Sequence, residues 1–265
     1  MRVPINGTVI NYVERGLPQG FPIIFIHGFP FNHTMWDPQM MAIPHEFRAV
    51  AFDLRGHGSS DVGDAQYWLE YFVDDLFALM DHLGIASAAL AGLSMGGYVA
   101  LRAVQRESAR VRGLILADTR SEADSNEAKV KRAQQATIVR TRGVEAFAGE
   151  FLKAVLAPET LAKNRAVTEK VRAMITQNSA AGIAGTLLAL ATRTDTTEAL
   201  ASITVPSLIL VGQLDALTPP EAARALHSRI SSSELHIVPG AAHMSNLENP
   251  GSFNASLLAF LKRLH

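Results

Sequence analysis

The amino-acid sequence predicts an α/β fold, in which a largely parallel β-sheet is covered by helices. Short apolar runs alternate along the chain with longer stretches whose apolar residues recur at helical spacing. Several short runs are apolar at nearly every position, as in strands buried on both faces of a parallel sheet. Hydrophobic side chains make up 48% of the residues, which is enough to fill such a core.

Size and charge restrict the class of protein further. The chain has 265 residues, and at roughly 150 residues per domain we expect one domain that carries an insertion. Its 24 Lys and Arg residues balance 25 Asp and Glu residues, and no basic stretch stands out, so we expect no nucleic-acid partner. The absence of cysteine excludes disulfides, thiolate metal sites and a cysteine nucleophile.

The sequence gives no sign of membrane association. No segment approaches the roughly 18 uninterrupted apolar residues of a membrane span. The stretch from Met1 to Tyr12 lacks a basic region followed by an apolar one, the pattern of a secretory signal. We therefore expect a cytoplasmic protein with no membrane partner.

The first expected element is an antiparallel hairpin at the edge of the sheet. Within Val3–Tyr12, apolar residues flank Asn6-Gly7, and Asn-Gly is a preferred two-residue hairpin turn. Later runs predict buried strands over Pro22–His27, Phe47–Asp53, Ala86–Leu93, Val111–Ala117, Pro206–Gly212 and Glu234–Pro239. Helical spacing is found in Tyr67–Leu83, Tyr98–Arg106 and Ser252–Leu264.

Residues 121–200 interrupt the alternation of strands and helices. Their apolar residues recur at helical spacing, and no run reads as a convincing strand. We interpret this region as a helical insertion between residues 1–120 and 201–265.

The strongest functional signal is Gly92-Leu93-Ser94-Met95-Gly96, which follows an apolar run and precedes a helical one. This context is that of a nucleophile elbow, a sharp strand-to-helix turn that exposes a serine hydroxyl. Its glycines relieve crowding in the turn. A plain glycine-rich turn would look the same, and a serine hydroxyl is a weak nucleophile. A catalytic Ser94 therefore needs a histidine base and an acid farther along the chain.

Both partners have candidates just beyond later strands. Asp215 follows the expected strand that ends at Gly212, and His243 follows the one that ends at Pro239. In this fold context, the acid and the histidine are expected on loops that follow the elbow serine in the chain, and the order Ser94, Asp215, His243 agrees with that. Asp118, directly after the strand that ends at Ala117, is a rival for the acid.

A reaction at Ser94 also needs two donors for the oxyanion. The Met95 N–H, at the start of the helix, is one candidate. The second should come from His27-Gly28-Phe29-Pro30 after an early strand, and we select the Phe29 N–H because Pro30 has none.

Taken together, these residues resemble the α/β-hydrolase fold family, specifically its small esterase, lactonase and perhydrolase branch. The loop Asp53–Ser60 (Asp-Leu-Arg-Gly-His-Gly-Ser-Ser) is also similar to the loop after that family's fourth strand. The resemblance implies an eight-stranded, mostly parallel sheet with helices on both sides. It also implies a helical cap after the sixth strand, so that residues 121–200 form the cap and residues 1–120 and 201–265 the core. We interpret Asp53, Arg55 and His57 as structural.

The pocket around Ser94 is expected to be apolar and to bind a hydrocarbon part of the substrate. Two cap residues, Phe147 and Phe151, fit core packing between cap and sheet better than contact with a ligand. The residues expected around the pocket are Gly28, Phe29, Phe31, Trp36, Met95, Leu217 and Met244.

The expected activity is hydrolysis of a small carboxylic ester or lactone through an acyl-enzyme, without metal or organic cofactor. Met35–Gln39 and Asp118–Arg120 are similar to segments of enol-lactonases and acyl-homoserine lactonases. Perhydrolysis or carbon–carbon bond cleavage by the same triad, and a silent ligand receptor, are the alternatives. Neither the substrate nor the oligomeric state can be read from the sequence. Four arginines could anchor an acidic lactone, although exposed arginines are usually just solvated: Arg120, Arg140, Arg142 and Arg193.

Overall fold

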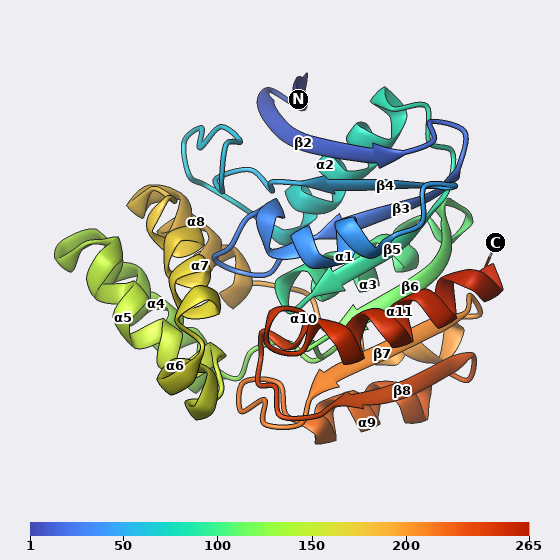
Figure 1. Ribbon diagram of the computed structural model, residues 1–265. Coiled ribbons are helices and arrows are strands. Elements are labelled where there is room, and N and C mark those ends of the chain that lie inside the picture. The colour runs from blue at the N-terminus through green and yellow to red at the C-terminus, as the bar shows by residue number, and fades with distance from the viewer. Residues whose placement is uncertain (265) are drawn as a thin grey trace.

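The computed structural model describes residues 1–264 and contains a single eight-stranded sheet with the strand order β1-β2-β4-β3-β5-β6-β7-β8 (Figure 1). Only β1 and β2 run antiparallel to their neighbours, and the remaining pairs are parallel. The expected α/β-hydrolase fold class is thereby confirmed. The strands are β1 (Arg2–Ile5), β2 (Thr8–Gly16), β3 (Phe21–Ile26), β4 (Phe47–Phe52), β5 (Ala88–Leu93), β6 (Val111–Ala117), β7 (Ser207–Gly212) and β8 (Ser233–Val238).

The edge hairpin forms where the Asn-Gly pair predicts it. Asn6 and Gly7 have φ values of +48° and +72°, and β1 pairs with β2 on either side of them. Two successive residues with positive φ match the twist of the flanking strands, and few residues other than Asn and Gly adopt this conformation readily.

Helices cover both faces of the sheet. In Figure 1, α1 and α11 lie in front of the strands and α2 and α3 lie behind them. The sequence did not predict α1, α9 or α10, because the first and last are very short and α9 buries only Ala223 and Leu226. The bounds are α1 (Asp37–Ala42), α2 (Leu69–His82), α3 (Met95–Arg106), α9 (Pro220–Arg229), α10 (Ser245–Glu248) and α11 (Pro250–Leu264), with short 3-10 turns at His33–Trp36, Ser108–Arg110 and Glu198–Ser202.

Five helices and no strand lie between β6 and β7 in the described chain. They form a separate layer beside the ends of the strands, at the left of Figure 1, and we call this layer the cap. Its bounds are α4 (Asn126–Arg142), α5 (Val144–Val155), α6 (Pro158–Lys163), α7 (Arg165–Thr176) and α8 (Ala180–Ala191). None of the helices within residues 1–264 is both long enough and apolar enough to cross a membrane.

A buried ion pair ties the loop after β4 to α2. Asp75 is fully buried on α2 and accepts two hydrogen bonds of 2.6 Å from the guanidinium of Arg55, one on each carboxylate oxygen. A third hydrogen bond, of 3.1 Å, comes from the side-chain amide of Asn6 in the hairpin turn. Asp75 therefore connects three segments that are distant in sequence.

We expect Asp75→Ala to lower the free energy of unfolding by about 3–5 kcal/mol, because it leaves the Arg55 charge without its buried partner. Urea denaturation measures the change. Asp81→Ala is the control on the same helix: Asp81 pairs with Arg110 but is 67% exposed, so its loss should cost no more than about 1 kcal/mol. Equal costs for the two variants would contradict this account of Asp75.

Candidate active site

Ser94 occupies a strained turn between β5 and α3. Its φ of +53° and ψ of −112° lie where side chains are seldom found. The turn is tight because backbone segments approach closely on both sides of it. A Cβ at Gly92 would lie 2.2 Å from the carbonyl oxygen of Gly96, and a Cβ at Gly96 would lie 2.1 Å from that of Ile26. Only glycine fits at either position.

Hydrogen bonds to the end of the neighbouring strand hold this turn in place. The Ser94 N–H donates to the carbonyl of Ala117, at 2.9 Å, and the hydroxyl of Thr119 donates to the carbonyl of Ser94, at 2.8 Å. The end of β6 therefore fixes the backbone of Ser94. Arg120 is the next residue along the chain after Thr119.

Asp215 and His243 meet as the sequence predicts. The imidazole Nδ1 of His243 lies 2.8 Å from Oδ2 of Asp215, and both residues are buried. The carboxylate also accepts hydrogen bonds from the backbone N–H of Leu217, at 2.8 Å, and from the hydroxyl of Thr218, at 2.6 Å. The turn after β7 thus orients the carboxylate, and the carboxylate orients the imidazole.

The surroundings of Asp215 favour its charged form. Burial opposes ionisation, but the adjacent His243 and the hydrogen bonds from Thr218 lower the pKa of Asp215 below its usual value. An ionised Asp215 accepts the hydrogen bond of the Nδ1–H group. This leaves the other nitrogen of the ring, Nε2, as a proton acceptor.

The rival acid, Asp118, has different partners. One of its carboxyl oxygens accepts a hydrogen bond of 2.8 Å from the Gly212 N–H, and the other is hydrogen-bonded to the hydroxyl of Ser245. Complete burial, followed by repulsion from Asp215, raises the pKa of Asp118 well above its usual value. The geometry therefore favours Asp215 over Asp118 as the partner of His243.

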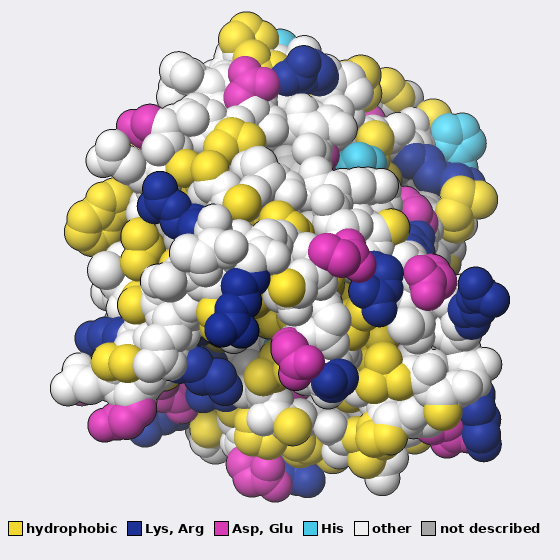
Figure 2. All heavy atoms as spheres, turned by 90° about the vertical axis from the view of Figure 1, so that its left-hand side faces the viewer, with side chains coloured by type: hydrophobic (Ala, Val, Ile, Leu, Met, Phe, Trp, Pro, Cys, Tyr) yellow, Lys and Arg dark blue, Asp and Glu magenta, His cyan; other side chains and the backbone are white. Residues whose placement is uncertain are grey.

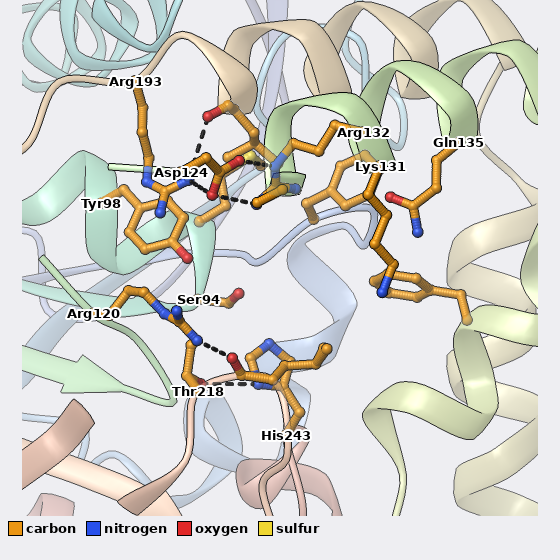
Figure 3. Close-up of a pocket in the computed structure, with 16 residues that line it drawn as sticks. Ser94, Tyr98, Arg120, Asp124, Lys131, Arg132, Gln135, Arg193, Thr218 and His243 are labelled. Atoms are coloured by element: carbon orange, nitrogen blue, oxygen red, sulfur yellow. Dashed lines mark hydrogen bonds and ion pairs between the residues drawn. The ribbon is translucent and has the colours of Figure 1, made fainter. Parts of the chain in front are cut away.

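Ser94 and His243 line the same cavity, which has a volume of about 240 Å³ and lies between the sheet and the cap (Figure 3). Met95 and Phe29 line it as well. Met95 is the first residue of α3, so its N–H has no partner within the helix. The loop that carries Phe29 runs close to the turn at Ser94, since a Cβ at Gly28 would lie 3.4 Å from the Cβ of Ser94.

The structure corrects several expected pocket residues. Leu217 lines the cavity, but Gly28, Phe31, Trp36 and Met244 do not. The last three are fully buried in the core, because their large apolar side chains pack beneath the loops rather than above them. Trp36, for example, packs between Phe25 of β3 and Phe253 of α11, with ring centroids 5.1 and 6.1 Å away.

The two cap phenylalanines stack on each other, with ring centroids 5.1 Å apart. Phe147 is buried behind the pocket wall, as expected. Phe151 was also expected to be core, but it lines the cavity and makes an edge contact with Phe29 at 5.8 Å.

The pocket is only partly apolar, because Phe29, Phe151 and Leu217 line it as an apolar pocket requires but one wall is polar and charged. Helix α4 contributes Ala128, Lys131, Arg132 and Gln135, which recur at the spacing of one helix face. The same spacing is visible in the sequence, but it joins mostly polar residues, and apolar periodicity does not reveal a polar helix face. Arg140 and Arg142, two suggested anchors, are exposed at the far end of α4 and are absent from the lining. The remaining polar lining residues are Tyr98, Arg120, Asp124, Arg193 and Thr218.

A buried charge cluster closes this wall. Arg193 lies at the end of α8, and its guanidinium and that of Arg132 both pair with the carboxylate of Asp124. Arg193 also donates a hydrogen bond of 2.6 Å to the carbonyl of Glu122 and lies 4.3 Å from the centre of the Tyr98 ring. Burial opposes ionisation of Asp124, but the two arginines lower the pKa of its carboxyl group.

Two polar side chains, the half-buried Glu248 and the buried Asn178, fasten the cap to the core. Glu248, just after the His243 loop, accepts hydrogen bonds from Ala242 N–H, at 2.9 Å, and from Ala157 N–H in the cap, at 2.8 Å. Asn178, between α7 and α8, accepts one of 2.7 Å from Gly58 N–H and donates one of 2.6 Å to the carbonyl of Pro30. These contacts fix the His243 loop and the loops after β3 and β4 against the helical layer.

The fold and this arrangement of residues define the class of the protein. Residues 22–250 match the alpha/beta hydrolase fold family, and the chain belongs to that family. Within residues 1–264, no three His, Asp or Glu side chains gather as metal ligands would.

Solved structures and curated proteins give the more particular likenesses. A thermophilic esterase from Thermogutta terrifontis, solved with malate bound, is 36% identical with a TM-score of 0.95, over 100% of this chain and 99% of that one. The enol-lactonase from Burkholderia xenovorans LB400 is 28% identical with a TM-score of 0.92, over 99% and 100%. The 3-oxoadipate enol-lactonase 2 of Acinetobacter baylyi is 29% identical over 97% of this chain and 95% of its own.

The raised pKa of Asp118 leads to a prediction about stability and pH. The folded state holds the Asp118 proton more tightly than the unfolded state, so this contribution is complete below about pH 4 and is lost as the pH rises toward the raised pKa. In Asp118→Asn, the amide can accept from Gly212 N–H and donate to Ser245 without a proton. We expect this variant to gain stability relative to the parent protein between pH 5 and pH 8, as measured by urea denaturation at both values. A difference that does not change with pH would contradict the expectation.

Proposed function

We propose that this protein is a serine hydrolase that cleaves carboxylic esters or lactones through an acyl-enzyme intermediate. The observation that carries the proposal is the buried Asp215–His243 pair, whose imidazole lines the same cavity as a serine on a strained strand-to-helix turn. The similarity to an esterase and to enol-lactonases over nearly the whole chain agrees with it.

In the first half of the reaction, Nε2 of His243 takes the Ser94 proton while Oγ attacks the substrate carbonyl. Asp215 keeps the Nδ1–H tautomer in place and stabilises the imidazolium that forms. The imidazolium then donates its proton to the departing alkoxide, which leaves the acyl group on Ser94. In a lactone, the alkoxide remains tethered to the acyl group.

In the second half, water attacks the acyl-enzyme carbonyl and gives its proton to His243. Each attack places negative charge on the carbonyl oxygen. The N–H groups of Met95 and Phe29 are the proposed donors for this oxyanion. One such donor lowers the activation barrier by about 3–4 kcal/mol. The positive end of the α3 dipole supports the same charge.

Ser94→Ala tests the nucleophile. We expect kcat/KM for 4-nitrophenyl butyrate to fall by about 10⁴-fold or more, because the variant cannot form the acyl-enzyme. A serine-directed fluorophosphonate should label the parent protein and not the variant, while the circular dichroism spectra and Tm values of both show that the fold persists.

Undiminished ester hydrolysis in Ser94→Ala would contradict the mechanism. Failure of the fluorophosphonate to label the parent protein would favour a silent ligand receptor. Peroxide-dependent halogenation that is faster than ester hydrolysis would favour perhydrolysis by the same three residues.

Asparagine substitutions separate the two acids. Asp215→Asn should lower kcat/KM by about 10⁴-fold, because the amide favours the wrong tautomer of His243. Asp118→Asn should stay within about tenfold of the parent protein, since the amide can keep the hydrogen bonds to Gly212 and Ser245 and Asp118 does not contact the imidazole. The reverse ranking of kcat/KM values would assign the acid to Asp118.

A further inference from the structure

The cavity in front of Ser94 has an excess of positive charge. Its described lining includes four cationic side chains, Arg120, Lys131, Arg132 and Arg193, and only one acid from the cap side, Asp124. The outer face of the cap does not share this bias. Figure 2 shows Lys and Arg side chains mixed there with Asp and Glu, without a continuous patch of either sign. The excess is therefore a property of the cavity.

Part of this charge is buried. The side chains of Arg193 and Asp124 are 2% and 7% exposed, and Asp124 is shared between Arg193 and Arg132. One carboxylate between two guanidinium groups leaves the cluster with net positive charge. The Nε of Arg193 is buried without a hydrogen-bond partner among the described residues. A buried net charge is costly, and an anion in the cavity would reduce that cost.

Two further cations have no acidic partner within residues 1–264. Arg120 donates a hydrogen bond to the carbonyl of Leu217, a neutral group, and Lys131 forms no ion pair within residues 1–264. In Figure 3, Arg120 lies on one side of Ser94 and Lys131 on the other, and both reach into the cavity. Arg120 follows Thr119, whose hydroxyl is bonded to the Ser94 carbonyl, so the backbone from which the Arg120 side chain extends is anchored beside Ser94.

We propose that the substrate carries a carboxylate, which Arg120 and Lys131 bind while the ester or lactone carbonyl reaches Ser94. The proposal rests on the proposed hydrolase function and adds the chemical class of its substrate. A guanidinium binds a carboxylate through two parallel hydrogen bonds, and a lysine adds a second charge from the opposite wall. Phe151 and Leu217 line the same cavity and would contact the hydrocarbon between the two functional groups.

The test compares two esters that differ only at the end of the acyl chain. Mono(4-nitrophenyl) adipate ends in a carboxylate, and 4-nitrophenyl hexanoate ends in a methyl group. The measured quantity is the ratio of their kcat/KM values, corrected for spontaneous hydrolysis. We expect the parent protein to favour the adipate ester by about tenfold or more at low ionic strength. The preference should shrink as salt screens Lys131, the more exposed cation.

Three variants locate the source of the preference. Arg120→Gln should lower the adipate-to-hexanoate ratio by about tenfold or more, and Lys131→Gln by a smaller, salt-dependent factor. Lys129→Gln is the matched control, because Lys129 is an exposed lysine on the same helix that does not line the cavity. It should leave the ratio unchanged. Because each variant is compared with itself, a general loss of activity does not affect the ratio.

Direct binding keeps the test independent of turnover. Calorimetry with adipate should detect binding to Ser94→Ala. Adding Arg120→Gln to this variant should weaken the binding, and adding Lys129→Gln should leave it unchanged. A parent protein that favours hexanoate, with a ratio that Arg120→Gln and Lys131→Gln leave unchanged, would overturn the carboxylate proposal while Ser94-dependent hydrolysis stands. Adipate binding through Arg120 without hydrolysis of either ester would support the anion site and contradict the hydrolase function.

Discussion

The close approach of backbone segments around Ser94 is the constraint on which the rest of the site depends. Gly92, Gly96 and the end of β3 are packed so tightly that no side chain fits between them. This packing forces Ser94 to a φ of +53° and places it at the start of α3, at the edge where the parallel strands end. The loops after β7 and β8 meet at the same edge, so Asp215 and His243 can join there although they are distant in sequence.

The sequence was sufficient for the features that depend on local rules. Apolar runs located the strands, Asn6-Gly7 located the hairpin turn, and the glycine pattern around Ser94 located the elbow. It was insufficient for the pocket wall. A large apolar residue near a site in sequence, such as Trp36, can be drawn into the core by Phe25 and Phe253. Which side chains line the cavity is decided by how the cap packs, and composition does not reveal that.

The two aspartates show how position separates groups of one chemical type. Asp215 is hydrogen-bonded by an imidazole and a hydroxyl, which favour the carboxylate, whereas burial and repulsion from that carboxylate raise the pKa of Asp118 well above its usual value. Both follow strands that are adjacent in the sheet, so the sequence alone could not choose between them. Burial and the nearest charges make the distinction.

The fastening of the cap by Glu248 and Asn178 bears on how a molecule enters and leaves. Glu248 holds the segment between α5 and α6, and Asn178 the segment between α7 and α8, against loops at the ends of the strands. Helix α4 is held to the rest of the cap instead, because its Arg132 shares the carboxylate of Asp124 with Arg193, just beyond α8. A molecule that enters or leaves the cavity therefore passes helices that are bonded to one another and to the core, so we expect this fixed opening to limit its size.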